Sequence, residues 1–276
     1  MAATTIDAEG FREFERSAHD RIADSYHAFF APITEHAAEP LLDAVDVRRG
    51  MRVLDVASGS GVLAGHAAAR GALVTGVDIS SRMVSLASQL NPACAFREGD
   101  AESLPFADGS FDALVCAFGI GHLPRAALAV AECTRVLVPA GRLAFAWWDV
   151  PARNRLHGVL LETVQEAGAK PPAGMPAGPP MFRYSDDLEF SALLASAGLQ
   201  QVTVTPHAFA YRIRTADAFW DGAMGSLART SALLRGQAPE VQDRIRSTFD
   251  RLVAAYSTSH GVSVPMAFKI ASGRKV

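Results

Sequence analysis

The sequence has few cysteines, no excess of one charge and no long apolar run, and each absence excludes a class of protein. Its three cysteines, Cys94, Cys116 and Cys133, are not spaced with one another or with histidine as zinc ligands would be, and they favour a reducing compartment. No apolar run approaches the ~20 residues that cross a bilayer, and the N-terminus lacks the order of a signal peptide. We therefore expect a cytoplasmic protein without a metal site or a membrane span.

Charge is balanced along the chain. Lys and Arg total 26 against 29 Asp and Glu, a formal net charge of -3, and no stretch concentrates basic residues as nucleic-acid binding requires. We therefore expect a small-molecule partner and no nucleic acid, while a homodimer is left open. The chain has 276 residues, 49% of them hydrophobic, which is enough for one large core, so we expect a single domain over 1–276.

Short apolar runs alternate with helical patterns in the middle of the chain. Strands buried on both faces and joined by helices are typical of a parallel α/β sheet. The expected strands span 52–56, 73–77, 93–97, 111–117 and 142–148, and the helices between them span 62–69, 82–90 and 126–136. We predict an N-terminal helical segment over 1–48, a core over 49–150, and a third part over 151–276.

The third part has a different pattern. Seven of the eleven residues 170–180 are Pro or Gly, so this stretch is a loop. A helix opened and capped by Ser185 is expected next, followed by a strand over 201–205. A helical insert over about 215–257 then precedes a last strand over about 264–272.

The glycine-rich segment VLDVASGSG ends the first expected strand and leads directly into a helical pattern. Small residues at such a turn let the backbone approach a ligand and let helix N-terminal amides face it. Gly59, Gly61 and Ala64, with Asp78 downstream, also satisfy the loose fingerprint of a nicotinamide-dinucleotide site. The segment alone leaves open a plain turn, a dinucleotide site and a site for S-adenosyl-L-methionine (SAM).

Three further features favour SAM. Asp55, at the end of the first strand, can accept hydrogen bonds from a ligand ammonium group, which nicotinamide dinucleotides lack. Asp100 and Glu102 follow the third strand at the edge of the sheet where an adenine can be bound. The fourth strand ends in CAFGIGH, which would line the crevice beside a reacting methyl group. Taken singly, Asp100 could only cap a turn and Asp55 could only bind loop amides, but together they favour SAM.

Residues from about 51 to 149 resemble the core of the class I SAM-dependent methyltransferases, especially the group of ubiquinone/menaquinone-biosynthesis C-methyltransferases (type 11). The matching segments are VLDVASGSG, VTGVDIS, EGDAESLPFADGSFDALVC and RVLVPAGRLAFAWWD. The resemblance implies a Rossmann-like, seven-stranded, mostly parallel sheet with an antiparallel last strand and helices on both faces. It implies transfer of the SAM methyl group to an acceptor, with S-adenosyl-L-homocysteine as the product.

The resemblance also implies which residues surround the cofactor. The residues come from several parts of the core: Asp55, Ala57, Gly59 and Gly61 surround the methionine part of SAM, Asp78 binds the ribose, Ile79 and Met83 pack near the ribose and adenine, and Asp100 and Ala101 bind the adenine. Glu102, Phe118 and, from the N-terminal helix, Tyr26 are also expected to contact the cofactor. The sequence departs from the family pattern at Ala57 and Ala140, where glycine is usual, although both replacements are small.

Methyl transfer from a sulfonium is an in-line displacement, and alignment alone supplies roughly 7 to 11 kcal/mol in favourable cases. A catalytic pair is therefore not required, but a phenol, hydroxyl or acidic carbon would benefit from a base. His122 is our candidate base, although it could instead only bind a backbone carbonyl. We expect the Pro-Gly loop and the helical insert to cover a hydrophobic acceptor pocket. The candidate pocket residues are His27, Phe182, Tyr184 and Trp220.

Two other functions remain open from the sequence. One is a nicotinamide-dependent oxidoreductase, which the Asp55 position and the GDAESLPF segment disfavour. The other is a methyltransferase fold that serves as a scaffold without methyl transfer, because a fold does not guarantee a function. The sequence does not identify the acceptor or whether oxygen, nitrogen or carbon is methylated.

Overall fold

A mixed eight-stranded sheet forms the centre of the computed structural model, which describes residues 6–276. Its strand order is β3-β2-β1-β4-β5-β8-β6, with β7 beside β8. The five strands of the parallel part are β1 (Arg52–Val56), β2 (Leu73–Asp78), β3 (Ala95–Glu98), β4 (Phe111–Ala117) and β5 (Leu137–Trp148). The last strand, β8 (Gly261–Arg274), is antiparallel to β5, as predicted. The eighth strand is the two-residue β7 (Ser257–Thr258), which is too short to leave a sequence pattern.

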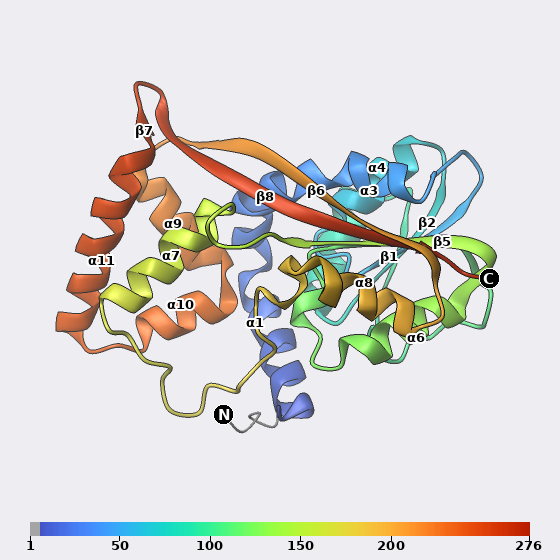
Figure 1. The fold of residues 1–276 in the computed structure, drawn as a ribbon, viewed down its shortest axis with the longest axis horizontal. Coiled ribbons are helices and arrows are strands. Elements are labelled where there is room, and N and C mark those ends of the chain that lie inside the picture. The colour runs from blue at the N-terminus through green and yellow to red at the C-terminus, as the bar shows by residue number, and fades with distance from the viewer. Residues whose placement is uncertain (1–5) are drawn as a thin grey trace.

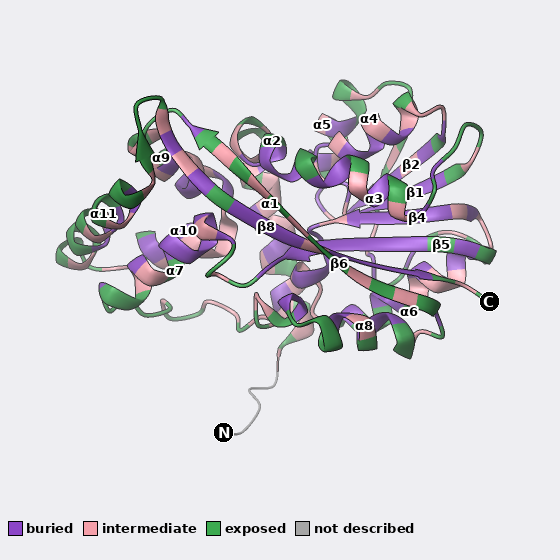
Figure 2. Ribbon diagram, turned by 45° about the horizontal axis from the view of Figure 1, so that its top comes forward, coloured by how far each residue is buried: buried purple, intermediate pink, exposed green. Residues whose placement is uncertain are grey.

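Helices cover both faces of this sheet (Figure 1). The crossover helices α4 (Val62–Ala69), α5 (Ser81–Leu90) and α6 (Ala126–Val136) agree with the predicted ranges. In Figure 1, α3 and α4 lie above the sheet, while α6 and α8 (Asp187–Ser196) lie below it. This arrangement explains why β4 is mostly buried and why β5 is buried from Leu143 to Trp148, as Figure 2 shows.

The N-terminal segment is helical over residues 8–44 and consists of one long helix and three short pieces, while positions 1–5 of the predicted range lie outside the described residues. It comprises α1 (Ala8–Phe29), α2 (Ala31–Thr34), a 3-10 turn (Glu35–Ala37) and α3 (Ala38–Ala44). Pro32 lies in the first turn of α2, where a backbone N–H would have no partner within the helix, so the helix loses no hydrogen bond to the proline. Helix α1 lies between the sheet and the C-terminal helices and packs against both α5 and α9. Helix α1 therefore contacts both the sheet region, through α5, and the helical insert, through α9.

A long two-stranded ribbon connects the sheet to the helical insert. Strand β6 (Gln200–Ile213) pairs with β8 along nearly its whole length and extends far beyond the predicted range 201–205. The predicted strand ended just before Pro206. The strand can continue through this proline because β6 lies at the edge of the sheet, where prolines are tolerated. The insert, at the far end of this ribbon in Figure 1, consists of α9 (Ala216–Ser226), α10 (Ala228–Arg235) and α11 (Pro239–Val253).

The helix after the Pro-Gly loop begins one residue later than predicted. Asp186, not Ser185, caps α8: its carboxylate accepts hydrogen bonds from the amides of Leu188 at 2.8 Å and Glu189 at 3.0 Å. The Ser185 hydroxyl instead donates to the carbonyl of Phe182 at 2.6 Å. A carboxylate is the stronger acceptor at a helix N-terminus, so the competition favours Asp186. The remaining helix, α7 (Arg155–Glu166), follows β5. Within residues 6–276, no helix has the length and hydropathy to cross a membrane.

Candidate active site

The turn between β1 and α4 exposes backbone at the carboxyl edge of the sheet. Ala57, Gly59 and Gly61 all have positive φ, at 54°, 52° and 81°. A Cβ on Gly61 would lie only 2.7 Å from the Asn91 amide, whereas a Cβ on Gly59 would meet nothing within 4 Å. Gly61 is therefore required by packing against α5. Gly59 leaves open space at the place where a ligand would approach the turn.

Ala57 occupies the position where the family pattern has glycine, and it keeps the left-handed backbone that favours glycine. Its methyl group faces Gly119, where an added Cβ would lie 2.6 Å from the Ala57 Cβ. Because Gly119 has no Cβ, the methyl group of Ala57 fits beside it. Phe118, the residue before it, also has positive φ (58°) and stacks on Trp148 with ring centroids 3.8 Å apart. Such strained positions cluster at functional sites.

Asp78 connects this turn to β2. Its Oδ2 accepts a hydrogen bond from the Gly59 amide at 2.8 Å, and its Oδ1 accepts one from the Ser80 amide at 2.9 Å. The residue is 8% exposed, and burial raises the pKa of its carboxyl group above the ordinary value. Both oxygens are therefore oriented by backbone and still have lone pairs for a hydroxyl donor.

Asp55 is buried without a complete set of partners. It is 1% exposed, and its Oδ2 has no hydrogen-bond partner within residues 6–276. Burial, followed by the nearby Asp78, raises the pKa of Asp55 to about 8. A buried carboxyl group in this state is stabilised by a cationic donor such as an ammonium group.

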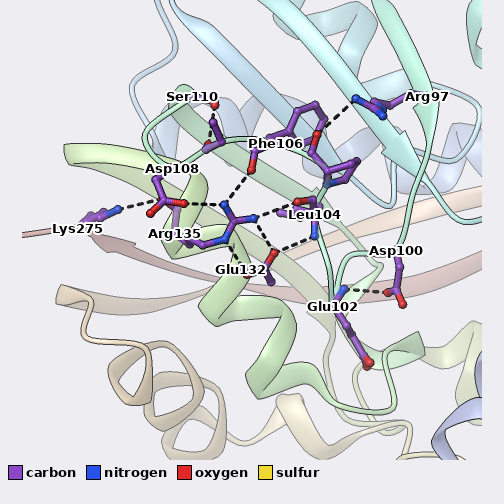
Figure 3. A network of polar contacts seen from close by, with 12 residues as sticks. Arg97, Asp100, Glu102, Leu104, Phe106, Asp108, Ser110, Glu132, Arg135 and Lys275 are labelled. Carbon is purple, nitrogen blue, oxygen red and sulfur yellow. Dashed lines mark hydrogen bonds and ion pairs between the residues drawn. The ribbon is translucent and has the colours of Figure 1, made fainter.

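The loop after β3 carries Asp100 and Glu102, and hydrogen bonds from α6 hold it in place (Figure 3). Arg135 of α6 donates to the carbonyls of Leu104 at 3.0 Å and Phe106 at 2.8 Å. Asp100 Oδ1 accepts a hydrogen bond from the Glu102 amide at 2.8 Å, which shapes the start of the loop. The position of Asp100 is thereby fixed before any ligand binds.

Glu102 was predicted to contact the cofactor, but the structure gives its side chain other partners. It is 4% exposed and binds Arg12 of α1 at 2.7 Å and Arg125 before α6 at 2.8 Å. Arg12 also forms an ion pair with Asp100 at 3.0 Å. Burial opposes ionisation, but these hydrogen bonds hold the pKa of Glu102 below its ordinary value. Glu102 therefore ties α1 to the loop and does not line the cleft.

A cleft with about 810 Å³ of atom-free space, which we call the carboxyl-edge cleft, lies over these strand ends. Most of the predicted cofactor residues line it: Tyr26, Ala57, Gly59, Asp78, Ile79, Met83, Asp100, Ala101 and Phe118, together with His122. Asp55 lines a smaller adjoining cavity, which shares Tyr26, Ala57, Gly59 and Ala117 with the cleft. Gly61 lines neither, because its Cα faces α5.

A larger cavity with about 1590 Å³ of atom-free space, the apolar cavity, adjoins the carboxyl-edge cleft. Its wall is formed by α1, the ends of β4 and β5, α7, residues 175–182 of the Pro-Gly loop, and residues 226–233 of the insert. Four residues line both this cavity and the carboxyl-edge cleft: His19, Tyr26, Phe118 and His122. Burial raises the pKa of Tyr26 to about 12, so its hydroxyl stays neutral at this border.

Of the predicted acceptor residues, only Phe182 lines the apolar cavity. His27 instead contacts the Ser60 hydroxyl at 3.0 Å. Tyr184 is 5% exposed and packs on Phe190, while Trp220 packs on Phe249 in the insert. These aromatic residues form core between helices, because an apolar pattern indicates burial but not the partner that buries it.

Glu15 and Arg12, both on α1, belong to the site but were not predicted from the sequence. Glu15 is buried, one turn after the buried Phe11, and it lines the carboxyl-edge cleft with Arg12. A glutamate at i+4 from an apolar residue on the buried face of an amphipathic helix was the available signal. His19, one further turn along, lines both cavities, whereas the predicted pocket residue His27 lines neither of them.

Comparison with known proteins decides among the interpretations of this site. Residues 54–145 match the family model described as a methyltransferase domain. The chain is 37% identical over 169 residues to a demethylmenaquinone methyltransferase of Beutenbergia cavernae, covering 58% of this chain and 70% of that protein. It is 32% identical to a ubiquinone/menaquinone biosynthesis C-methyltransferase, UbiE, of Rhizobium leguminosarum bv. trifolii, covering 60% of this chain and 72% of that protein.

The chain belongs to the UbiE-like class I SAM-dependent methyltransferases. Its fold agrees with that of the YcgJ protein from Bacillus subtilis, with a TM-score of 0.58 and 20% identity over 87% of this chain and 98% of that one. The nicotinamide interpretation of the glycine turn is thereby set aside. The methyltransferase also has a structure that fits SAM, since Asp55 keeps an unpartnered buried oxygen and the space beside Gly59 is open.

Proposed function

We propose that the methyltransferase binds SAM along the carboxyl-edge cleft and the adjoining cavity. Asp55 receives the ammonium group, because it is a buried carboxyl group without a full set of partners and it lines the adjoining cavity. Asp78 accepts hydrogen bonds from the ribose hydroxyls, since backbone amides already orient both of its oxygens. Asp100 and the Ala101 amide face the adenine, with Met83 packed beneath it.

The methyl acceptor occupies the apolar cavity in this proposal. Aromatic, aliphatic and proline side chains dominate its wall, and among residues 6–276 Arg229 is the one permanently charged side chain of that wall. The acceptor is therefore a small, largely hydrophobic molecule with a polar substituent. The quinone methyltransferases among the relatives act on molecules of this kind, as their names state.

One observation carries the proposal: the two cavities meet at the same four residues. His19, Tyr26, Phe118 and His122 line both the carboxyl-edge cleft and the apolar cavity. When bound, SAM supplies an electrophilic methyl group on a positively charged sulfur. Tyr26 and Phe118 present oxygen or an aromatic face at the border, and both stabilise positive charge nearby. The surrounding aromatic wall excludes water, and the border holds the acceptor in line with the methyl group.

Calorimetry tests the proposed donor site. Purified protein is expected to bind SAM and S-adenosyl-L-homocysteine, and Asp78→Ala is expected to weaken both by about 10- to 100-fold, because the lost hydrogen bonds involve a charged group. Asp24→Ala is the matched control, since Asp24 is an exposed carboxylate that pairs only with Arg82 on the surface. If neither compound binds the unaltered protein, or if both variants bind equally well, the donor site lies elsewhere.

A further inference from the structure

A buried carboxylate and two histidines meet at the border between the two cavities. Glu15 and His19 lie one turn apart on α1, and His122 ends the 3-10 turn Ile120–His122 after β4. One oxygen or ring nitrogen from each side chain lies within 4.8 Å of the others. Glu15 is only 4% exposed, and its Oε1 has no hydrogen-bond partner among the described residues. Holding SAM requires no such buried charge on the acceptor side.

The contact between Glu15 and His122 determines which ring nitrogen is free. His122 Nδ1 lies 3.1 Å from Glu15 Oε2. An ionised carboxylate can only accept a hydrogen bond, so Nδ1 carries the hydrogen and Nε2 keeps its lone pair in the neutral ring. The ring also packs edge-on against Trp147, with centroids 5.5 Å apart. Gly121 permits this packing, because a Cβ there would lie 2.0 Å from the indole.

The charges around the pair favour an ionised Glu15. Titratable or charged groups face Glu15 or His122 from four elements: His19 from α1, Asp78 from β2, His157 from α7 and Arg229 from α10. Burial alone would raise the pKa of Glu15, but the hydrogen bond from His122 and the charge of Arg229, together with the charges that His122 and His19 carry when protonated, bring it below its ordinary value. Burial lowers the pKa of His157 to about 3, so His157 adds no charge.

We infer that Glu15 and His122 form a proton-accepting pair for an acceptor that carries a hydroxyl group, such as a phenol, naphthol or enol. This inference rests on the proposed function. His122 Nε2 takes the hydroxyl proton while the oxygen gains the methyl group, so an O–C bond forms and the S–C bond breaks with its electron pair left on sulfur. Glu15 stays ionised and stabilises the imidazolium through the Nδ1–H bond. The proton then leaves to water, because the His122 side chain is 42% exposed.

His122 is thus the catalytic residue of this pair, and Glu15 is its positioning residue. Two naphthols of one skeleton test the assignment. At about neutral pH, 1-naphthol keeps its hydroxyl proton, whereas 4-nitro-1-naphthol is already an anion and needs no base. With 1-naphthol, His122→Gln is expected to lower kcat by about 10²- to 10⁴-fold and Glu15→Leu by about 10²-fold. With 4-nitro-1-naphthol, both variants are expected to stay within about threefold of the unaltered enzyme.

Two surface variants serve as controls in the same naphthol assay. Glu13→Leu lies on the exposed side of α1, and His36→Gln lies on the surface beside Phe209, so neither is expected to change the rates. An equal loss with both naphthols would show a structural role and overturn the pair. Failure to methylate either naphthol while SAM still binds would overturn the hydroxyl acceptor but not the donor site. Dependence on an added divalent cation would overturn the pair too, because the three side chains would then be metal ligands.

A second measurement needs no acceptor. In protein labelled with 15N-histidine, the neutral His122 ring is expected to carry its hydrogen on Nδ1, and Glu15→Leu is expected to shift the hydrogen to Nε2. Glu15→Gln keeps an acceptor oxygen, so it is expected to retain the Nδ1–H form while lowering kcat with 1-naphthol less than Glu15→Leu does. A tautomer that is the same in the unaltered protein and in Glu15→Leu would overturn the positioning role of Glu15.

Discussion

The two cavities that meet at His122 are built from different parts of the chain. The carboxyl-edge cleft is made largely by turns that directly follow parallel strands, and residues of α1 complete it, so most of its amides and carboxylates are fixed by local backbone geometry. The apolar cavity is made by side chains from α1, α7, the Pro-Gly loop and the insert, which are brought together only by tertiary packing. The donor side is therefore set mainly by local backbone geometry, and the acceptor side is apolar and set by side-chain volume. Substitutions should affect the two sides separately.

The strongest test of the polar side is Asp55→Asn. This change removes the buried negative charge that we assign to the ammonium group, and it is expected to weaken SAM binding by about 10- to 100-fold. Calorimetry measures the affinity, with the exposed Asp46→Asn as the control. Since burial raises the pKa of Asp55 to about 8, SAM binding near neutral pH should also release a proton from the unaltered protein. Titration in two buffers of different ionisation enthalpy detects that proton, which should be absent in Asp55→Asn.

The same residue makes stability without ligand depend on pH. The folded protein holds the Asp55 proton up to a pH of about 8, whereas the unfolded chain loses it near the ordinary value of 3.8. The unfolded state thus binds fewer protons across this window, so the free energy of unfolding falls as pH rises. Asp55→Asn is expected to remove this contribution and to raise the Tm at about pH 8 more than at about pH 5. A larger gain at the lower pH would show that Asp55 is ionised in the folded protein.

The matching test of the apolar side fills the cavity. Leu233 of α10 lines the apolar cavity and does not line the carboxyl-edge cleft. Leu233→Trp is expected to raise the KM for 1-naphthol by about tenfold or more, because the added ring takes space from the acceptor. SAM affinity should change by less than about twofold. Leu188→Trp, on an exposed position of α8, is the control. A parallel loss of SAM affinity in Leu233→Trp would show that the two sides are coupled.

The same contrast explains what could be predicted from the sequence. Asp78, Met83 and Ala101 were placed correctly at the cleft, because each follows a strand end at a short, fixed distance along the chain. Tyr184 and Trp220 were predicted to line the acceptor pocket, but their positions depend on how distant helices pack. An apolar residue must be buried somewhere, and the sequence pattern does not specify the neighbour.

Glu15 illustrates the same limit from the polar side. Its pattern on α1 indicates a buried carboxylate, but its role depends on the end of β4, which lies over a hundred residues later in the chain. Only the crossing of α1 over the strand ends brings it to His122 (Figure 1). The sequence therefore predicted the position of a residue at the cleft where one strand and its following turn fix that position. The prediction failed where two segments far apart in the sequence must meet.

The smallest expected effect concerns the two alanines that replace family glycines. Ala57 lies in the turn between β1 and α4, and Ala140 lies in the turn inside β5. Both have positive φ, at 54° and 65°. A left-handed alanine costs roughly 1–2 kcal/mol, and a glycine loses roughly 0.5–1 kcal/mol of chain entropy, so Ala140→Gly should raise the free energy of unfolding by about 0.5–1 kcal/mol. The control Ala68→Gly, in the helix α4, should lower it by about 1 kcal/mol. Denaturant titration compares them, and a loss of stability in both variants would contradict the strain at Ala140.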